Sequence, residues 1–181
     1  MQASVIQPVV ELCRAELWHA CDVGTKRKAM HRVALAKGEK RPDRNEQRGG
    51  VEKDPWHEVE SACAEYATAK YLRRWWPGNW WSVGKTVDIP PDIEVRWTEY
   101  EATGRLLVYD QDNPLYRYVL VTGTMPSYRL IGWIYGRDAM DPRFRGRLKP
   151  DRPEMQIVPR EELLPVTELM RFDEGGETEA E

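Results

Sequence analysis

Cysteine and histidine are scarce in this chain of 181 residues, and neither type is spaced for zinc or disulfide chemistry. There are three of each, and the cysteines form no CxxC pair and no zinc-type pattern with the histidines. An odd number of cysteines without such spacing argues against a disulfide framework. The sequence therefore predicts free or buried thiols in a reducing compartment, at Cys13, Cys21 and Cys63.

Long hydrophobic runs are also missing. No stretch stays apolar over the roughly 20 residues that a membrane-spanning helix needs, and the N-terminus lacks the basic and then apolar pattern of a secretory signal. We therefore expect a cytoplasmic protein with no membrane partner.

Phenylalanine occurs only twice, whereas tryptophan and tyrosine occur eight times each. Tryptophan and tyrosine rings carry a polar end, so they can line a cleft as well as fill a core. Four of the tryptophans form two pairs, at 75–76 and 80–81. These pairs predict either a hydrophobic lid over a sheet or a stacking platform beside a nucleic-acid groove.

The composition suits one compact domain, because hydrophobic residues make up 41% of the chain and charged residues 31%. We expect a single domain over residues 1–172, with a mobile basic loop at about 38–53, and an acidic disordered tail at 173–181. The tail carries five acids and no base, so the net charge of −3 becomes +2 without it. That body is compatible with DNA as a partner, and the sequence leaves a homo-oligomer open.

The order of the expected elements predicts an α+β fold with an α/β/α-like arrangement. Apolar residues recur at helical spacing over 1–37, with a break at Gly24, and over 56–72 after the helix-starting pair Asp54-Pro55. A run of strands follows, of which we expect the first two to form a hairpin, at 93–99, 105–109, 116–122, 128–135 and 155–158. Gly132 predicts a bulge or a close approach in its strand.

Acidic residues gather around the central helix and the first of these strands. Glu65 shares an apolar helix stripe with small residues, and an ionised Glu there needs a cation or a hydrogen-bond partner. Asp88 and Asp92 come just before Glu94, so a helix and a strand could bring three carboxylates to one divalent cation. Mg²⁺ and Mn²⁺ prefer such oxygen ligands. Pairing of Glu65 with an arginine at the helix edge is the structural alternative.

Basic residues form three groups that could contact a phosphate backbone. The first lies near the start of an expected helix, the second follows the central helix, and the third lies in a Pro/Gly-rich connection at 136–153. Solvated polar surfaces are the alternative interpretation of each group. The candidate nucleic-acid-binding residues are Lys26, Arg27, Lys28, Arg73, Arg74, Arg143 and Arg145.

The segments Glu60–Leu72, Asp88, Glu94-Val95-Arg96, Val119–Gly123 and Gly132–Ile134 together resemble the PD-(D/E)xK nuclease superfamily, in particular its phage and prophage proteins. The resemblance covers about residues 54–140. It implies a restriction-endonuclease-like core, with a central mixed β-sheet and a catalytic hairpin flanked by N-terminal helices. It also implies Mg²⁺-dependent hydrolysis of DNA phosphodiester bonds, in the host cytosol if the protein is phage-encoded.

The resemblance implies catalytic roles for Glu65, Asp88, Glu94 and Arg96. Metal ligation falls to Glu65, Asp88, Glu94 and the carbonyl of Val95, with Asp92 as the alternative to Asp88. Arg96 stands where the superfamily has lysine. Arginine stays protonated, so it can hold phosphate but cannot act as a base. A catalytically inactive relative that binds nucleic acid or a partner protein is therefore the alternative function.

Overall fold

The computed structural model describes residues 7–38, 56–80, 86–150 and 153–174. The predicted helix start at Asp54-Pro55 lies outside these ranges. So does all but the first residue of the predicted loop at 38–53. Of the predicted tail, only Asp173 and Glu174 are described, and they end a helix. None of the helices in the described ranges combines the length and apolarity needed to cross a bilayer.

A four-stranded sheet forms the centre of the molecule and confirms the α+β class. Its strands lie in the order β1 (Val9–Glu11), β5 (Ser127–Tyr135), β4 (Arg117–Thr124) and β2 (Ile93–Thr98). β2 runs parallel to β4, whereas the other neighbours are antiparallel, so the sheet is mixed. The predicted helix over the first residues is therefore wrong at its start, because Val9–Glu11 pairs with the edge of β5.

The predicted hairpin between 93–99 and 105–109 is also wrong. β3 (Leu106–Val108) leaves β2 and joins a second small sheet, in the order β3-β7-β6, with β7 (Met155–Val158) and β6 (Arg145–Gly146). β4 is buried along nearly its whole length. A strand buried on both faces is typical of a sheet centre, and β4 has β2 on one side and β5 on the other.

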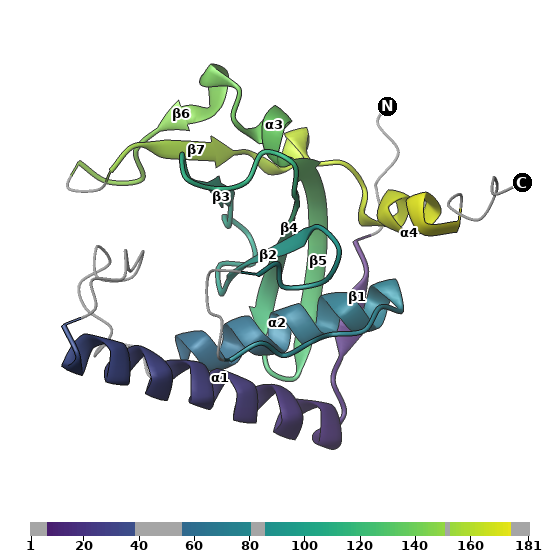
Figure 1. Ribbon diagram of the computed structural model, residues 1–181. Helices are drawn as coiled ribbons and strands as arrows, with labels where there is room; N and C mark the ends of the chain where they lie inside the picture. The colour runs from purple at the N-terminus through teal and green to yellow at the C-terminus, as the bar shows by residue number, and fades with distance from the viewer. Residues whose placement is uncertain (1–6, 39–55, 81–85, 151–152, 175–181) are drawn as a thin grey trace, which may run out of the picture.

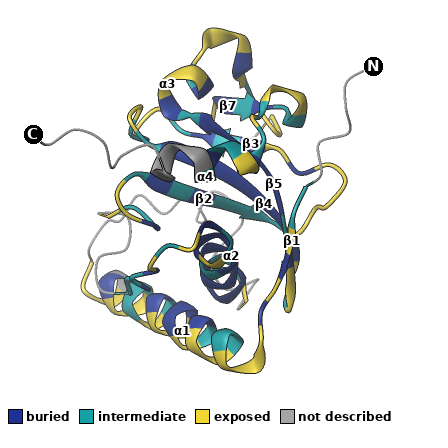
Figure 2. Cartoon of the chain, turned by 90° about the vertical axis from the view of Figure 1, so that its right-hand side faces the viewer, coloured by how far each residue is buried: buried dark blue, intermediate teal, exposed yellow. Residues whose placement is uncertain are grey.

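Two long helices cover one face of the main sheet. α2 (His57–Leu72) lies between the sheet and α1 (Arg14–Ala36), as Figures 1 and 2 show. Ten of the sixteen residues of α2 are buried, because the helix is covered from two sides. This arrangement confirms the prediction of N-terminal helices packed on the sheet.

Gly24 does not break α1; it brings α1 close to α2. A Cβ atom added at Gly24 would lie 2.5 Å from Cα of Val59 and 2.6 Å from the carbonyl oxygen of Glu58. Any larger residue would push the helices apart. The sequence pattern therefore identified Gly24 correctly as a special position, but the predicted role was wrong: Gly24 allows close helix packing and does not end a helix.

After β5 the described chain forms four short helices. Their bounds are α3 (Gly136–Ala139), η2 (Pro142–Phe144), η3 (Arg160–Glu162) and α4 (Val166–Glu174). Of these, α3, η3 and α4 contact β5. Gly132 shows both predicted features. The register between β4 and β5 shifts beside it, and a Cβ added there would lie 2.7 Å from Cβ of Leu163.

Candidate active site

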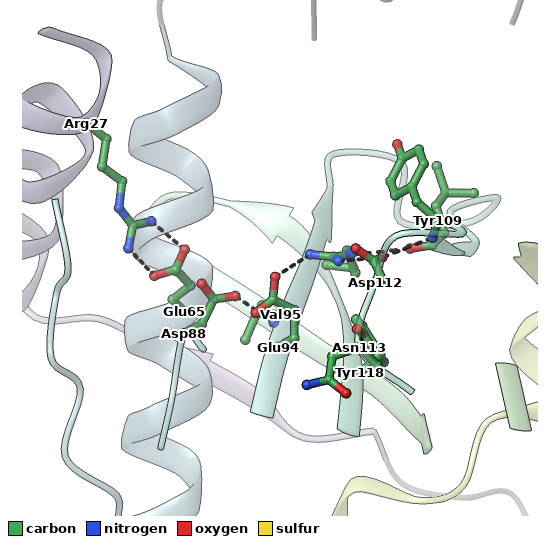
Figure 3. Close-up of polar contacts among 11 residues, drawn as sticks. Arg27, Glu65, Asp88, Glu94, Val95, Tyr109, Asp112, Asn113 and Tyr118 are labelled. Atoms are coloured by element: carbon green, nitrogen blue, oxygen red, sulfur yellow. Dashed lines mark hydrogen bonds and ion pairs between the residues drawn. The ribbon is translucent and has the colours of Figure 1, made fainter. Parts of the chain in front are cut away.

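Six charged residues form a row from α1, past α2 and β2, to the turn after β3, and Figure 3 labels all of them except Arg96. We call this set the charged row. Neighbouring members of the row influence one another through hydrogen bonds or through their charges. In order, its members are Arg27, Glu65, Asp88, Glu94, Arg96 and Asp112.

Glu65 lies in the middle of α2 and faces Arg27 of α1. The Arg27 guanidinium donates from Nη1 to Oε1 at 2.5 Å and from Nη2 to Oε2 at 2.8 Å. Trp76 adds a third donor, from Nε1 to Oε2 at 3.1 Å. Arg27 is 8% exposed and Glu65 is 4% exposed. Burial acts to lower the pKa of Arg27, but the Glu65 carboxylate outweighs it and raises that pKa.

A tight chain reversal places Asp88 beside Glu94. Ile89 and Ile93 exchange two backbone hydrogen bonds of 3.0 Å across the reversal, which is an antiparallel bridge outside the named strands. The amide of Val95 then donates to Oδ2 of Asp88 at 2.8 Å. This short bridge stands at the place where the resemblance predicted a catalytic hairpin.

Asp88 lies between Glu65 and Glu94 in the row, and the charges of both neighbours act on it. Burial raises the pKa of the Asp88 carboxyl well above its ordinary value, and the Glu65 and Glu94 carboxylates raise it further. Arg27 and the amide of Val95 oppose this shift. Figure 3 shows the same relation, with Asp88 standing between Glu65 and Glu94.

Asp92, the alternative to Asp88, lies outside the row. Its carboxylate accepts two hydrogen bonds from Arg117, from Nε at 2.9 Å and from Nη2 at 2.5 Å. The backbone amide of Arg117 also donates to the carbonyl of Asp92 at 2.8 Å. The geometry therefore assigns Asp88, and not Asp92, to the side of Glu94.

Arg96 joins Glu94 to Asp112 at the other end of the row. Its Nη1 donates to Oε1 of Glu94 at 2.9 Å, and its Nη2 donates to Oδ2 of Asp112 at 2.8 Å. The guanidinium also lies over the ring of Tyr118, 5.1 Å from the centroid. Burial raises the pKa of Glu94, with Arg96 acting against the shift and Glu65 adding to it.

Asp112 was not singled out in the sequence, because Asp110–Pro114 has the composition of a turn. The structure shows why the residue matters: it is 7% exposed and accepts from the amide of Tyr109 at 3.0 Å as well as from Arg96. A carboxylate that caps a turn and binds a buried arginine has no periodic signal. Only the packing of the turn against β2 identifies it.

Arg27 did leave a signal in the sequence. The buried residues of α1 include Ala20, Val23, Gly24, Arg27 and Ala34, at steps of three and four. Arg27 therefore belongs to the stripe that faces α2. The predicted helix break at Gly24 concealed this stripe.

As arranged, the three acids are not an open three-ligand metal site. Within the described ranges, no three or more histidine, cysteine or acidic side chains are placed to hold a metal ion. Both oxygens of Glu65 accept hydrogen bonds from Arg27. Asp88 and Glu94 remain adjacent hard-oxygen donors, and one or two carboxylates with waters are a common Mg²⁺ arrangement. Ligation by the carbonyl of Val95 stays a prediction.

The seven predicted nucleic-acid-binding residues do not share one surface. The predicted surface position of Arg27 is wrong, because its guanidinium is buried against Glu65. Arg145 begins β6, which lies at the end of the molecule opposite α1 (Figure 1), and Arg143 lies on η2, directly before β6. They form ion pairs there, Arg143 with Glu162 at 2.9 Å, and Arg145 with Asp110 and Glu154.

The remaining basic candidates lie nearer to the charged row. Lys26 pairs with Asp22 at 2.6 Å, and Lys28 is half-buried on the same helix. Arg73 is exposed at the end of α2 in a left-handed conformation, with a φ of 54°. Arg74 donates to the carbonyl of Pro90 at 3.2 Å, so it touches the reversal that carries Asp88.

Among the described residues, Lys70 does not lie beside the row as a substitute for the lysine that the resemblance implies. Lys70 binds the Glu16 carboxylate at 2.7 Å and the carbonyl of Glu11 at 2.9 Å, and Lys85 lies outside the described residues. Arg96 is therefore the basic group next to Glu94 in the part of the chain that the structure describes.

No family model matches this chain, and neither curated proteins nor solved structures show a significant similarity to it.

Proposed function

We propose that the protein is a metal-dependent nuclease that hydrolyses DNA phosphodiester bonds, with Asp88 and Glu94 as the principal ligands of Mg²⁺ or Mn²⁺. The observation that supports this most strongly is the middle of the charged row. Three acids from α2, the chain reversal and β2 adjoin there, and the raised pKa values of Asp88 and Glu94 reflect their proximity and burial. A divalent cation would relieve that repulsion.

The residues around the two ligands have positioning roles in this proposal. The Val95 amide orients Asp88, Arg96 orients Glu94, and Asp112 anchors Arg96. A bound divalent cation supplies charge neutralisation at the phosphate and a water that is more acidic than bulk water. Side chains held by such partners keep the geometry that catalysis needs.

Arg96 contributes charge and orientation, and it is not the base. Its pKa is raised further by Glu94 and Asp112, against the lowering effect of burial, so the guanidinium stays protonated. Three of its N–H groups already have partners, at Glu94, Asp112 and the carbonyl of Leu107. Arg96 therefore holds positive charge beside Glu94, and a cation held by Asp88 and Glu94 would supply the activation of water that Arg96 does not provide.

The fold supports the proposal in its broad arrangement. A helix that carries one acid packs on a mixed sheet, and the sheet's parallel pair of strands carries another acid beside a chain reversal. This is the arrangement that the resemblance to the PD-(D/E)xK superfamily implies, and we propose a restriction-endonuclease-like core on that basis. DNA in the cytoplasm is the proposed partner, and Arg74 touches the reversal that carries Asp88 through the carbonyl of Pro90.

A DNA cleavage assay with matched variants tests the proposal. Supercoiled plasmid is incubated with the protein in Mg²⁺, Mn²⁺ or EDTA, and nicked and linear products are quantified. Asp88→Asn and Glu94→Gln should abolish metal-dependent cleavage. Asp92→Asn is the control, because Asp92 belongs to the same reversal but pairs with Arg117 outside the row. Equal cleavage by the wild type and Asp88→Asn, with both folded by circular dichroism, would refute the metal site.

The alternative is a catalytically inactive protein of this fold that binds nucleic acid or a partner protein. The pairing of Glu65 with Arg27 and of Glu94 with Arg96 favours it, because each acid already has an internal cation. It predicts DNA binding by fluorescence anisotropy with no cleavage even in Mn²⁺. Cleavage that disappears in Glu94→Gln excludes it.

A further inference from the structure

The Arg27 guanidinium lies where a cation would meet Glu65. It comes from α1, a helix that carries none of the three acids, and it binds both oxygens of the carboxylate. Asp88 influences Glu65 from the other side, as Figure 3 shows. Arg27 thus neutralises Glu65, one of the three acids predicted to bind the cation, while Asp88 and Glu94 remain adjacent.

Arg27 is fixed in this position by contacts besides Glu65. Its Nε donates to the carbonyl of Asn79 at 2.8 Å, and Trp76 shares Oε2 of Glu65 with it. The neighbouring Gly24 brings α1 within contact of α2, which shortens the distance that Arg27 has to span. The Arg27 guanidinium is therefore held in the interface between α1 and α2 and is not part of a freely moving surface side chain.

The charge of the row matches a single divalent cation. Its four acids and two arginines give a formal charge of −2 when all are ionised. One Mg²⁺ or Mn²⁺ neutralises that charge, whereas two would leave a positive charge of similar size in a largely buried site. An uncompensated buried charge is strongly unfavourable, so the row as built favours one cation over two.

Resting on the proposed function, we infer that Arg27 takes the place of a second cation at Glu65 and limits the site to one divalent cation, held by Asp88 and Glu94. Arg27 is in this account a positioning residue that sets the metal stoichiometry. Its removal frees Glu65 as a ligand and raises the number of cations that the protein binds.

Mn²⁺ binding to the full chain without DNA tests this inference, with electron paramagnetic resonance to count bound ions and calorimetry to measure affinity. The wild type should bind one Mn²⁺, and Arg27→Met should bind two. The double variant Arg27→Met/Glu65→Gln, which removes both charges of the pair, should bind one again with an affinity within about threefold of the wild type. Arg117→Met, which breaks the Arg117–Asp92 pair outside the row, should also bind one.

The outcomes separate this inference from the function that it refines. Two Mn²⁺ ions on the wild type, one on a folded Arg27→Met, or none on the double variant would each overturn the role of Arg27 and leave the nuclease proposal standing. No bound Mn²⁺ on the wild type would overturn both. If Arg27→Met does not fold, the double variant still tests the inference, because a double variant that binds no Mn²⁺ overturns it. Where Arg27→Met folds, its melting temperature should also rise more with Mn²⁺ than that of the wild type.

Discussion

The charged row and the surface around β6 both contain arginine–carboxylate pairs, and the two regions differ in what surrounds these pairs. In the charged row, Arg27 and Glu65 have side chains 9% and 5% exposed. Around β6, Arg145 and Glu154 have side chains 38% and 46% exposed. The chemistry of the pairs is the same, but water can replace either partner only around β6. The comparison shows that burial, and not ion pairing alone, identifies the side chains that the fold holds in one position.

The two regions also differ in what lies between their charges. The pairs around β6 and η2 alternate bases and acids across the surface, so each acid meets a base. In the row, three acids adjoin between two arginines. Alternation needs no further ligand, whereas a run of like charges in a buried place is unfavourable unless a proton or a cation joins it. This contrast is the reason for placing function in the row.

The largest expected effect separates the two regions by activity. Glu94→Gln should lower metal-dependent DNA cleavage by at least about a thousandfold, since a metal ligand accounts for several kcal/mol of charge stabilisation. Glu162→Gln, which removes the partner of Arg143 at the surface, should leave the rate unchanged. Initial rates of plasmid nicking at saturating Mg²⁺ measure both. Equal losses of cleavage rate in Glu94→Gln and Glu162→Gln would contradict the assignment of catalysis to the charged row.

The second effect concerns stability. Arg27→Met should lower the free energy of unfolding by about 3–5 kcal/mol, because it leaves a buried carboxylate without its partner. The double variant Arg27→Met/Glu65→Gln should recover most of that loss, since neither charge remains. Urea denaturation followed by tryptophan fluorescence measures the three proteins. A loss below about 1 kcal/mol, as for an exposed pair, would show that the Glu65 carboxylate reaches water.

The third effect is a pH dependence of stability. Asp88 and Glu94 have raised pKa values in the folded protein, so the native state binds more protons than the unfolded state just above their ordinary values of 3.8 and 4.5. Their contribution to stability is then fully present below those values and is lost as the pH rises through the raised values. The melting temperature should fall over that window in the absence of metal, and Mg²⁺ should offset the fall.

Asp88→Asn supplies the control for the pH effect, because asparagine does not titrate. The difference in melting temperature between wild type and variant, followed by circular dichroism from acid to neutral pH, isolates the contribution of this one group. It should change in favour of the variant as the pH rises. A difference that stays constant over the whole range would mean that Asp88 is not perturbed.

The smallest effect belongs to the surface. Arg145→Ala should change the free energy of unfolding by less than about 1 kcal/mol, because exposed ion pairs contribute little. DNA cleavage should be unaffected, since Arg145 lies at the far end of the molecule from α1. Denaturation in urea and a nicking assay measure the two quantities. A strong loss of DNA binding in this variant would instead support the nucleic-acid role that the sequence predicted for Arg143 and Arg145.

Local features of the site could be predicted from the sequence, because they depend on short spacings. Glu65 inside a run of small apolar residues marks a buried helical acid, and the closeness of Asp88 to Glu94 in the chain predicts neighbouring carboxylates. Each of these statements depends on fewer than ten neighbouring residues. The choice between Asp88 and Asp92 did not follow, because it depends on Arg117, which binds Asp92 from the next strand of the sheet.

The long-range part of the fold could not be predicted in the same way. Hairpin pairing of β2 with β3 and parallel pairing of β2 with β4 bury the same alternating residues of β2, so the pattern of that strand is identical in both. Arg27 is 38 residues from its partner Glu65, and its basic neighbours Lys26 and Lys28 favour an exposed face although its spacing from Ala20 and Val23 fits the buried stripe. Only the docking of α1 on α2 at Gly24 turns it inward.

The central claim is that Asp88 and Glu94 hold a divalent cation, and a crystal of the full chain soaked in Mn²⁺ tests it most directly. Anomalous diffraction at the manganese edge should show one peak within coordination distance of both carboxylates, with Arg27 still bound to Glu65. A crystal of Asp88→Asn treated in the same way should lack the peak. A well-soaked wild-type crystal with no anomalous peak beside Asp88 and Glu94 would contradict the account.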